Sequence, residues 1–332
     1  MTATGPRVDD LEIVPLESTS PEAVAALITA CGVSRFLVEE PYVGDSRDSY
    51  LLQRILGDAE RDDALALGAL RKGRLAGLLV LRFPAWDREH FGFTVARVEH
   101  LQGSDASALS HLVDRGVQEL QSRAVTMCSA RLSGDALVGL HCLEARGFRF
   151  QELTLSPWRD LASWEQRSFG VTRPTEAADV PSMRAIARRA FRTDRFHRDT
   201  GFTQEAADGV YDKWVSTWHT NPGRDRYSRV LALDGQVAGF FMYEVLHPRG
   251  RAGDPVVSVV LDAVGPDRAG RGHGFKMYCD VLDAVSTQAR FATVTVVAAN
   301  AAAVNLCMKL GFRLTGSGEV TLHWWAEGKG GE

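Results

Sequence analysis

The sequence predicts an α/β protein in which one mixed-sheet fold occurs twice in tandem. The chain has 332 residues, which exceeds one typical domain and leads us to expect two. Residues 256–312 read as strand, glycine-rich turn, helix, strand and helix, so they contain a βαβ unit. The segment LVGLHCLEARGF at 137–148 aligns with 301–312, and both end in Gly-Phe. The first half therefore repeats the pattern of the second.

The elements of the first half follow from hydrophobic periodicity and turn residues. The polar and aromatic segment 36–48 is predicted to be a loop. A second aromatic and charged segment, WDREHFGF at 86–93, fits either a packed loop with satisfied polar groups or a ligand site, and both interpretations stay open. The other predicted elements are a strand at 11–15, helices at 21–31 and around 51–56, a hairpin of 65–70 with 75–82, a strand at 95–101 and a helix at 106–122.

The second half begins after a predicted linker at 157–170. Its charged segment DRFHRD, 194–199, fits either a solvated loop or a site where Arg195, His197 and Arg198 recognise phosphate or carboxylate. The other predicted elements are helices at 179–191 and around 207–215 and a hairpin of 230–233 with 237–245.

The most informative stretch is Gly270-Arg271-Gly272-His273-Gly274, which lies between an apolar strand, 256–264, and an amphipathic helix. Unpaired N–H groups and the positive end of the dipole face outward at such a helix start, and missing side chains let a phosphate approach the backbone. No Lys-Ser/Thr pair follows the glycines, as the P-loop of nucleotide-hydrolysing proteins requires. No acidic residue ends a second strand about twenty positions later, as the dinucleotide-binding loop requires. The sequence therefore fits neither of these phosphate loops. A glycine turn without a ligand remains the alternative.

The residues after this loop extend the pattern. A buried strand is predicted at 291–297, and a helix begins at Asn300 and ends at Gly311. Together these segments resemble the GNAT acyltransferases, whose motifs read V-x-P-x-x-[Q/R]-G-x-G-x-[G/A] and N-x-x-A-x-x-L-Y-x-x-x-G-F. The matching residues are Val264, Pro266, Gly270, Gly272, Gly274, Asn300, Ala303, Leu306, Gly311 and Phe312.

The resemblance implies two tandem GNAT folds, at 8–158 and 170–328. It also implies acetyl-CoA as co-substrate, with its pyrophosphate at the glycine loop 270–274 and its pantetheine arm along Ala263 and Val264 and touching Asn300. Two positions depart from the motifs. Ala269 replaces the Gln or Arg that supports the loop, and Cys307 replaces the Tyr that protonates the departing thiolate in many members.

The first copy lacks the phosphate loop. Its equivalent segment, 102–107, has one glycine, and Asp105 stands where the pyrophosphate would lie. Repulsion between the carboxylate and a phosphate would oppose coenzyme binding. We therefore expect a degenerate first copy that serves structure or substrate contact.

Three segments further resemble the GNAT branch that acetylates the amino group of TDP-4-amino-4,6-dideoxygalactose (TDP-fucosamine). They are 86–93, 194–199 and the final strand 320–325. This resemblance implies a nucleotide-linked amino sugar as acceptor. The substrate contacts that it suggests are Trp86, His90, Arg195 and His197.

The proton transfers require a base and an acid. Asp262 and His323 are the candidate bases for a direct attack on the thioester, and Cys307 is a candidate acid. Each has a structural alternative: a hydrogen-bonded strand aspartate, a packed histidine and a small core residue, respectively.

Composition limits the partners. The formal net charge is −4 and the hydrophobic content is 45%, which argues against nucleic acid or an anionic membrane as main partner. The five scattered cysteines suggest neither disulfides nor a zinc site, and the N-terminus lacks a signal peptide, so we expect a cytoplasmic monomer or homodimer without a metal. A mycothiol-synthase-like enzyme for another small amine, and a non-catalytic acetyl-CoA-binding module, remain alternatives.

Overall fold

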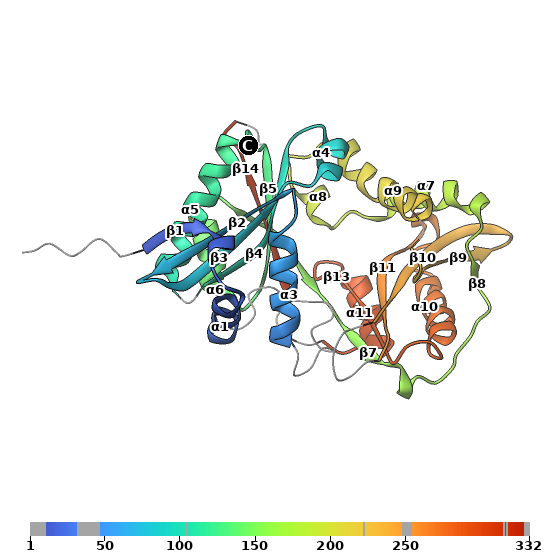
Figure 1. Ribbon diagram of the computed structural model, residues 1–332. Coiled ribbons are helices and arrows are strands. Elements are labelled where there is room, and N and C mark those ends of the chain that lie inside the picture. The colour runs from blue at the N-terminus through green and yellow to red at the C-terminus, as the bar shows by residue number, and fades with distance from the viewer. Residues whose placement is uncertain are drawn as a thin grey trace, which may run out of the picture. The chain divides into compact units, whose positions relative to one another are not determined.

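The computed structural model of the protein describes residues 11–31, 47–103, 105–221, 223–247, 254–314, 316 and 318–328. These residues form two compact units (Figure 1). The first unit contains the described residues up to 151 together with 319–328, and the second contains residues 152–318. The predicted loop at 36–48 lies almost wholly outside the described residues, apart from the start of a helix.

The first unit is built on a mixed sheet in the order β1-β2-β3-β4-β5-β14. All neighbours are antiparallel except β4 and β5, which are parallel. Strand β6 (Arg149–Leu155) begins in this unit and continues into the second. The strands are β1 (Leu11–Pro15), β2 (Ala64–Arg71), β3 (Arg74–Arg82), β4 (Val95–Gly103), β5 (Met127–Ser133) and β14 (Glu319–Trp325).

Helices cover both faces of this sheet, which explains why β3 is apolar at nearly every position. Alternate side chains of a strand point to opposite faces. Leu79 and Leu81 accordingly pack with α5 and α6, whereas Leu78 and Val80 pack with α1 and α3. The helices are α1 (Pro21–Cys31), α3 (Arg47–Ala59), α4 (Ala85–Phe91), α5 (Ala106–Ser122) and α6 (Leu137–Glu144).

The second unit is built on a mixed sheet in the order β7-β12-β11-β10-β9-β8, in which only β11 and β12 are parallel neighbours. A short strand, β13 (Val296–Val297), leaves this sheet and pairs with β6. The sheet strands are β7 (Trp158–Asp160), β8 (Thr172–Pro174), β9 (Arg226–Leu233), β10 (Gln236–Leu246), β11 (Val256–Val264) and β12 (Phe291–Val294).

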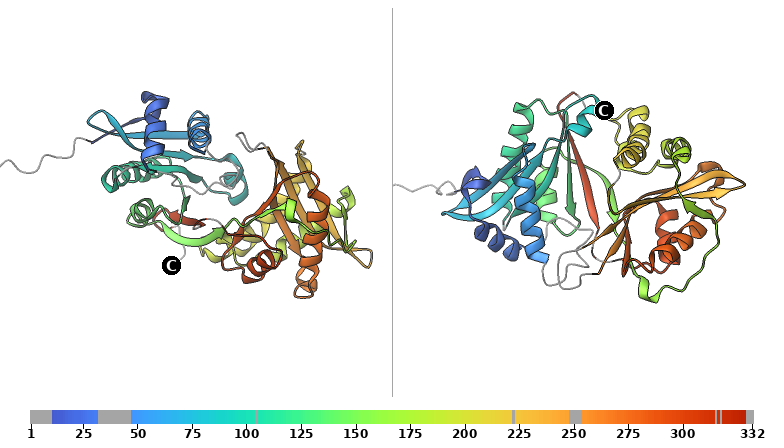
Figure 2. Two further views of the ribbon diagram at one scale, coloured as in Figure 1. Left: turned by 90° about the horizontal axis from the view of Figure 1, so that it is seen from below. Right: turned by 45° about the vertical axis from the view of Figure 1, so that its right-hand side comes forward.

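Helices also lie on both faces of the second sheet. Figure 1 shows α7 and α9 on one side and α10 and α11 on the other, and the right-hand view of Figure 2 shows the same arrangement. The main core of the unit lies between the sheet and the helices α10 and α11. The helices are α7 (Val180–Ala190), α8 (Arg195–Arg198), α9 (Gln204–Thr220), α10 (His273–Val285) and α11 (Ala301–Lys309).

The two sheets share an irregularity at the same place. In the first unit, parallel pairing of β4 with β5 ends at Val98, and the register between β3 and β4 shifts directly after that residue. In the second unit, pairing of β11 with β12 ends at Val259, and the register between β10 and β11 shifts there too. A shift of this kind inserts one extra residue into a strand and bends it. The structure therefore confirms the predicted mixed α/β fold class with two related sheets.

Several elements differ from the sequence-based expectations. The final strand, which we expected in the second domain, pairs with β5 in the first unit, because an alternating strand pattern does not specify its partner. The predicted linker 157–170 contains β7, which pairs with β12. Most of segment 86–93 is a helix, α4, rather than a loop. The helix ends at its C-cap, Gly92, which adopts the left-handed conformation typical of a helix end, with φ of 75°.

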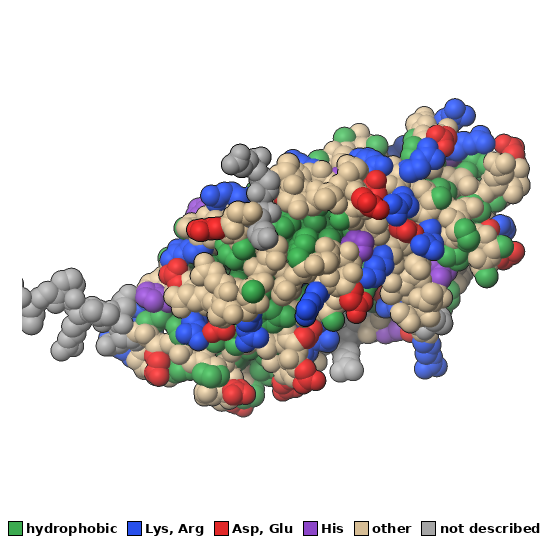
Figure 3. Space-filling view, turned by 90° about the horizontal axis from the view of Figure 1, so that it is seen from above, with side chains coloured by type: hydrophobic (Ala, Val, Ile, Leu, Met, Phe, Trp, Pro, Cys, Tyr) green, Lys and Arg blue, Asp and Glu red, His purple; other side chains and the backbone are tan. Residues whose placement is uncertain are grey.

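The exposed charges are mixed in sign. The chain has 38 Lys and Arg against 42 Asp and Glu, and Figure 3 shows positive and negative side chains interspersed on the face it presents. No helix within the described ranges is both long and apolar enough to cross a membrane.

Candidate functional site

The glycine loop joins β11 to α10 and leaves open space above its backbone. The Gly265 N–H donates a hydrogen bond of 2.8 Å to the carbonyl of Ala238, which fixes the loop to β10. Gly270 and Gly272 have φ values of +73° and +76°, in the left-handed region that favours glycine. A Cβ atom at either residue would meet no other atom within 4 Å. The space beside both glycines is thus free to receive a ligand.

Backbone donors line this space. Among the residues that the structure describes, none accepts a hydrogen bond from the N–H groups of residues 270–275, and the first N–H with a partner is that of Lys276, which donates to the Gly272 carbonyl. The loop ends where α10 begins at His273, so the positive end of the helix dipole adds to these donors. This arrangement fits a pyrophosphate.

Beside the loop, strands β11 and β12 separate. Their parallel pairing covers Val256 to Val259, and the chain beyond β12 pairs with β6 through β13. On its other edge, β11 stays paired with β10 as far as Val264. The β12-facing edge of Ala263 and Val264 therefore has no strand partner in the described part of the chain. It can pair with an extended amide-containing chain such as pantetheine.

Asn300, the third predicted coenzyme contact, caps α11. Its side-chain oxygen accepts a hydrogen bond of 3.2 Å from the N–H of Ala303. The side chain is exposed, so the cap orients it without burying it. Its contact with the coenzyme stays a prediction.

Asp262 lies on β11 within the separated stretch, and Tyr278 reaches it from α10. The Tyr278 hydroxyl donates a hydrogen bond of 3.0 Å to Oδ1 of Asp262. Burial raises the pKa of Asp262 to about 6, against the opposing effect of the Tyr278 hydrogen bond. The residue as a whole is partly accessible to solvent, but its carboxyl group is enclosed by protein atoms. The raised pKa brings the carboxyl closer to neutral pH, which suits a group that exchanges protons.

Sequence reasoning placed Asp262 but missed Tyr278. Tyr278 occupies the apolar stripe of α10 and is only 2% exposed, so it reads as a core aromatic. The available signal was a hydroxyl on an otherwise apolar stripe, since a buried hydroxyl needs a partner. Burial, and then the charge of Asp262, raise the pKa of Tyr278 well above its usual value, so the phenol stays a neutral donor.

Cys307 is buried on α11 and packs in the main core of the second unit with Leu310. Burial, and then the charge of Asp262, raise the pKa of its thiol to about 12. An ordinary thiol has a pKa of about 8.5, so Cys307 is a weaker acid than the thiol that it would protonate. The structure therefore favours the core role of Cys307 over acid catalysis.

His323 does not join Asp262 in the second unit. It lies on β14, opposite Ser129 of β5, and is 1% exposed within the first unit. Its placement follows from the pairing of the final strand with the first sheet, which the sequence did not indicate. Asp262 is the candidate base that lies with the glycine loop in one unit.

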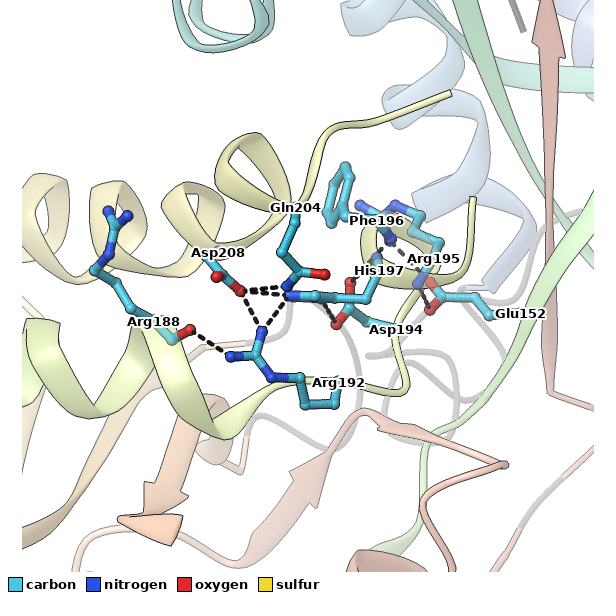
Figure 4. A network of polar contacts seen from close by, with 9 residues as sticks. All are labelled: Glu152, Arg188, Arg192, Asp194, Arg195, Phe196, His197, Gln204 and Asp208. Atoms are coloured by element: carbon cyan, nitrogen blue, oxygen red, sulfur yellow. Dashed lines mark hydrogen bonds and ion pairs between the residues drawn. The ribbon is translucent and has the colours of Figure 1, made fainter. Parts of the chain in front are cut away.

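The predicted substrate contacts Arg195 and His197 lie in a polar network that joins α8 to α9 and β6 (Figure 4). Arg195 forms an ion pair of 2.9 Å with Glu152, and its backbone N–H also donates to that carboxylate. The ring of His197 is hydrogen-bonded on one side to Asp194, at 2.6 Å, and on the other to Asp208, at 2.9 Å. Both side chains thus have partners within the protein.

The other two predicted contacts, Trp86 and His90, lie on α4 of the first unit. Their rings stack with centroids 5.5 Å apart. Between them, the buried Asp87 forms an ion pair of 2.6 Å with Arg97. Asp87 is thus paired within the protein, whereas the two rings stay partly exposed.

The equivalent loop of the first unit is closed by the protein itself. Asp105 caps α5, and its Oδ1 accepts a hydrogen bond of 2.7 Å from the N–H of Ala108. A Cβ atom on Gly103 would lie 2.6 Å from the Leu109 side chain, so the glycine serves close packing. A carboxylate here takes the place that a phosphate takes at an open helix start.

Comparisons with known proteins agree with this geometry. Residues 180–312 match the acetyltransferase (GNAT) family. No curated protein sequence matches the chain significantly.

Three solved structures share its fold. A GCN5-related N-acetyltransferase from Sphaerobacter thermophilus has a TM-score of 0.60 at 15% identity, with 95% of each chain covered. A tandem GNAT protein from the clavulanic acid biosynthesis pathway has a TM-score of 0.53 at 15% identity, over 97% of this chain and 99% of that one. A glucosamine N-acetyltransferase region of a fungal multi-domain β-N-acetylglucosaminidase has a TM-score of 0.63 at 10% identity, over 96% of this chain and 38% of that one.

The glycine loop, the separated strands and the family match all fall within residues 152–318. The alignment with the tandem structure extends over both units. The chain thus has a tandem GNAT fold, and residues 180–312, within its second unit, match the acetyltransferase (GNAT) family.

Proposed function

We propose that the second unit transfers an acetyl group from acetyl-CoA to the amine of a small molecule. The observation that carries this proposal is the row of N–H groups at 270–275, for which no described residue is an acceptor and which lies beside the separated edge of β11. The loop would hold the pyrophosphate, and the β11 edge at Ala263 and Val264 would hold the pantetheine amides. Arg271 and His273 contribute their backbone N–H groups to the same loop.

The chemistry is a direct attack without an acyl-enzyme. The amine nitrogen bonds to the thioester carbon, the C–S bond breaks, and the amine proton passes to Asp262, directly or through water. Backbone N–H groups on the separated edge of β11 would stabilise the oxyanion. The departing thiolate takes its proton from the bulk solvent. Cys307 is not assigned as its acid, because burial raises the pKa of the Cys307 thiol to about 12, above that of an ordinary thiol.

For the acceptor we propose a nucleotide-linked amino sugar. The sequence resemblance in segments 86–93, 194–199 and 320–325 supports this class, as does the fold shared with a glucosamine N-acetyltransferase region. Trp86 and His90 keep partly exposed rings that suit a sugar or a base. Arg195 and His197 would instead shape the second unit around the acceptor through their internal network.

The alternative acceptor is another small amine. The tandem GNAT protein that shares this fold is described as belonging to the clavulanic acid pathway, which supports an acceptor outside sugar chemistry. A non-catalytic module is disfavoured, because a carboxylate titrating near pH 6 beside the separated strands is suited to proton transfer.

A thiol-release assay with acetyl-CoA tests the proposal, with nucleotide amino sugars, free amino sugars and other small amines as acceptors. We expect release to depend on an amine and to be strongest with a nucleotide amino sugar. The matched control is Gly272→Glu, which places a side chain on a left-handed residue and a carboxylate in the cradle. Equal acetyl-CoA binding by Gly272→Glu and wild type in calorimetry would exclude the cradle, and release without any acceptor preference would exclude the amino-sugar class.

A further inference from the structure

Five aromatic side chains form an unbroken chain of ring contacts in the first unit. On α4, the ring centroid of His90 lies 5.5 Å from that of Trp86 and 4.7 Å from that of Phe91. The ring of Phe93, which follows the helix, lies 5.6 Å from that of Phe91 and 5.6 Å from that of Trp325 on β14. All of these residues stay partly exposed, and we call them the aromatic arc. Rings held in a fixed array with access to solvent suit the apolar face of a ligand.

A row of polar side chains crosses three strands of the first sheet. Arg97 of β4 lies opposite Ser129 of β5, and Ser129 lies opposite His323 of β14. Neighbouring strands lie about 4.8 Å apart, and residues opposite each other point to the same face of a sheet. Arg97, Ser129 and His323 therefore form a continuous line, which we call the polar row.

The aromatic arc and the polar row share one face of this sheet. Trp325 lies two residues beyond His323, and alternate residues of a strand point to the same face. Trp324, which lies between them, points to the other face and into the core with α5 and α6. An ion pair of 2.6 Å between Asp87 of α4 and Arg97 ties the helix to the polar row. Aromatic rings and hydrogen-bonding groups thus lie beside each other in the first unit.

Packing does not explain the polar residues on this face. On the same side of β3, Leu78 and Val80 are apolar and pack with α1 and α3. His323, at the end of the polar row, is also buried, with 1% exposure. Burying a polar group costs free energy that an apolar residue does not cost. We therefore expect the polar row to have a role other than packing.

The charges beside the polar row are balanced. The guanidinium of Arg97 pairs with Asp87, whose side chain is 4% exposed. Arg82 lies opposite Arg97 on β3 and pairs with Asp63 at 2.6 Å. Asp87 contacts only Nη2 of Arg97, and the Arg97 side chain is 44% exposed, which leaves its other N–H groups able to donate to a ligand. The face offers hydrogen bonds without an excess of positive charge, and so fits a neutral ligand better than a phosphate.

We propose that the aromatic arc and the polar row bind the sugar ring of the acceptor. The inference rests on the proposed function for the identity of this ligand. A sugar ring combines an apolar C–H face with a rim of hydroxyl groups that both donate and accept hydrogen bonds. The aromatic arc would contact the face, Arg97 and Ser129 would bond the hydroxyls, and His323 would close the buried end of the row. The first unit would thus select the sugar, and the second would transfer the acetyl group.

Calorimetric titration of the full chain without acetyl-CoA tests the site. The probes are UDP-glucosamine and UDP-galactosamine, which differ in the orientation of one hydroxyl, and UDP, which has no sugar. We expect both nucleotide sugars to bind wild type about tenfold or more tightly than UDP does. Their affinities should differ by about threefold or more, because a site built to bond a hydroxyl discriminates against one that is misplaced.

Variants assign the binding to the named residues. Trp86→Ala should weaken both nucleotide sugars roughly tenfold, the upper scale of a lost aromatic contact, and leave UDP unchanged. Ser129→Ala should weaken at least one of the two sugars about threefold, the scale of one hydrogen bond. Arg97→Lys keeps a charge for Asp87 but loses the guanidinium donors, so it should weaken both sugars with an unchanged melting temperature. Tyr227→Ala removes a ring that is 40% exposed on β9, and this control should bind as wild type does.

Two results would overturn the sugar site: wild-type affinity for the nucleotide sugars no higher than for UDP, or wild-type sugar affinity in Trp86→Ala. A parallel titration with acetyl-CoA separates these results from the proposed function. Acetyl-CoA binding without sugar binding would overturn the sugar site and leave the acetyltransferase proposal standing. Sugar binding without acetyl-CoA binding would overturn the acetyl transfer and leave the sugar site standing.

Discussion

Tyr278 and Asp262 form a buried hydrogen-bonded pair that links the helix after the glycine loop to the strand where acetyl transfer is proposed. The pair joins the two halves of the proposed site, because α10 begins at the proposed phosphate cradle and β11 carries Asp262, the proposed base. Its geometry makes separate predictions for each partner.

Asp262→Asn should lower kcat by about 10²- to 10⁴-fold, the usual contribution of a general base. The amide keeps the shape of the side chain, and its oxygen can still accept the hydrogen bond from Tyr278. The affinity for acetyl-CoA should therefore stay within about twofold of wild type, a change of well under the 1.36 kcal/mol that corresponds to a factor of ten. Steady-state kinetics and calorimetry measure the two quantities. Wild-type kcat in this variant would remove Asp262 from the mechanism.

Tyr278→Phe should move the acid limb of the pH–rate profile to higher pH. The Tyr278 hydrogen bond opposes the effect of burial on Asp262, so its loss raises the pKa of Asp262 further above its value of about 6. Since the deprotonated form acts as base, the variant loses activity at pH 6 to 7 and recovers it at higher pH. A profile that falls uniformly at every pH, with a lower melting temperature, would instead indicate a purely structural tyrosine.

Cys307→Ala should leave kcat at the pH optimum within about threefold of wild type, a change of less than the 1.4 kcal/mol that corresponds to a factor of ten. The thiol is held neutral in the core and cannot supply its proton to a better leaving thiol. The small cavity should lower the melting temperature slightly. A loss of kcat above a hundredfold with unchanged acetyl-CoA affinity would restore Cys307 as the acid.

His197→Ala should destabilise the second unit, because it leaves the carboxylates of Asp194 and Asp208 without their shared partner. A loss of about 1–3 kcal/mol is expected for such a network. Thermal melts detect it, and Arg198→Ala, a change at the exposed neighbour, is the matched control. Unchanged stability together with a higher KM for the acceptor would return His197 to direct substrate contact.

The glycine loop was predictable because its conformation is encoded locally. Gly270 and Gly272 occupy left-handed backbone, and only their immediate neighbours decide that the strand ends and the helix begins. Asp262 could be singled out for a similar reason, because it is the only charged residue in the apolar strand 256–264.

The remaining features depend on partners far away in sequence. Arg195 lies 43 residues from Glu152, and no local pattern connects them. Tyr278 looks like any core aromatic until the strand places Asp262 beside it. His323 was assigned to the wrong half because the alternation of a strand fixes which side chains face inward but leaves the neighbouring strand undetermined.

The position of β14 affects how the first unit folds during synthesis and how a truncated chain behaves. Strand β5 pairs with β4 on one edge and with residues 319–325 on the other. During synthesis, the second of these edges therefore stays open until residues 319–325 have left the ribosome. Open edges invite pairing with other chains. A fragment that ends before Glu319 should therefore aggregate through its N-terminal part, although every residue it lacks comes from the opposite end of the sequence.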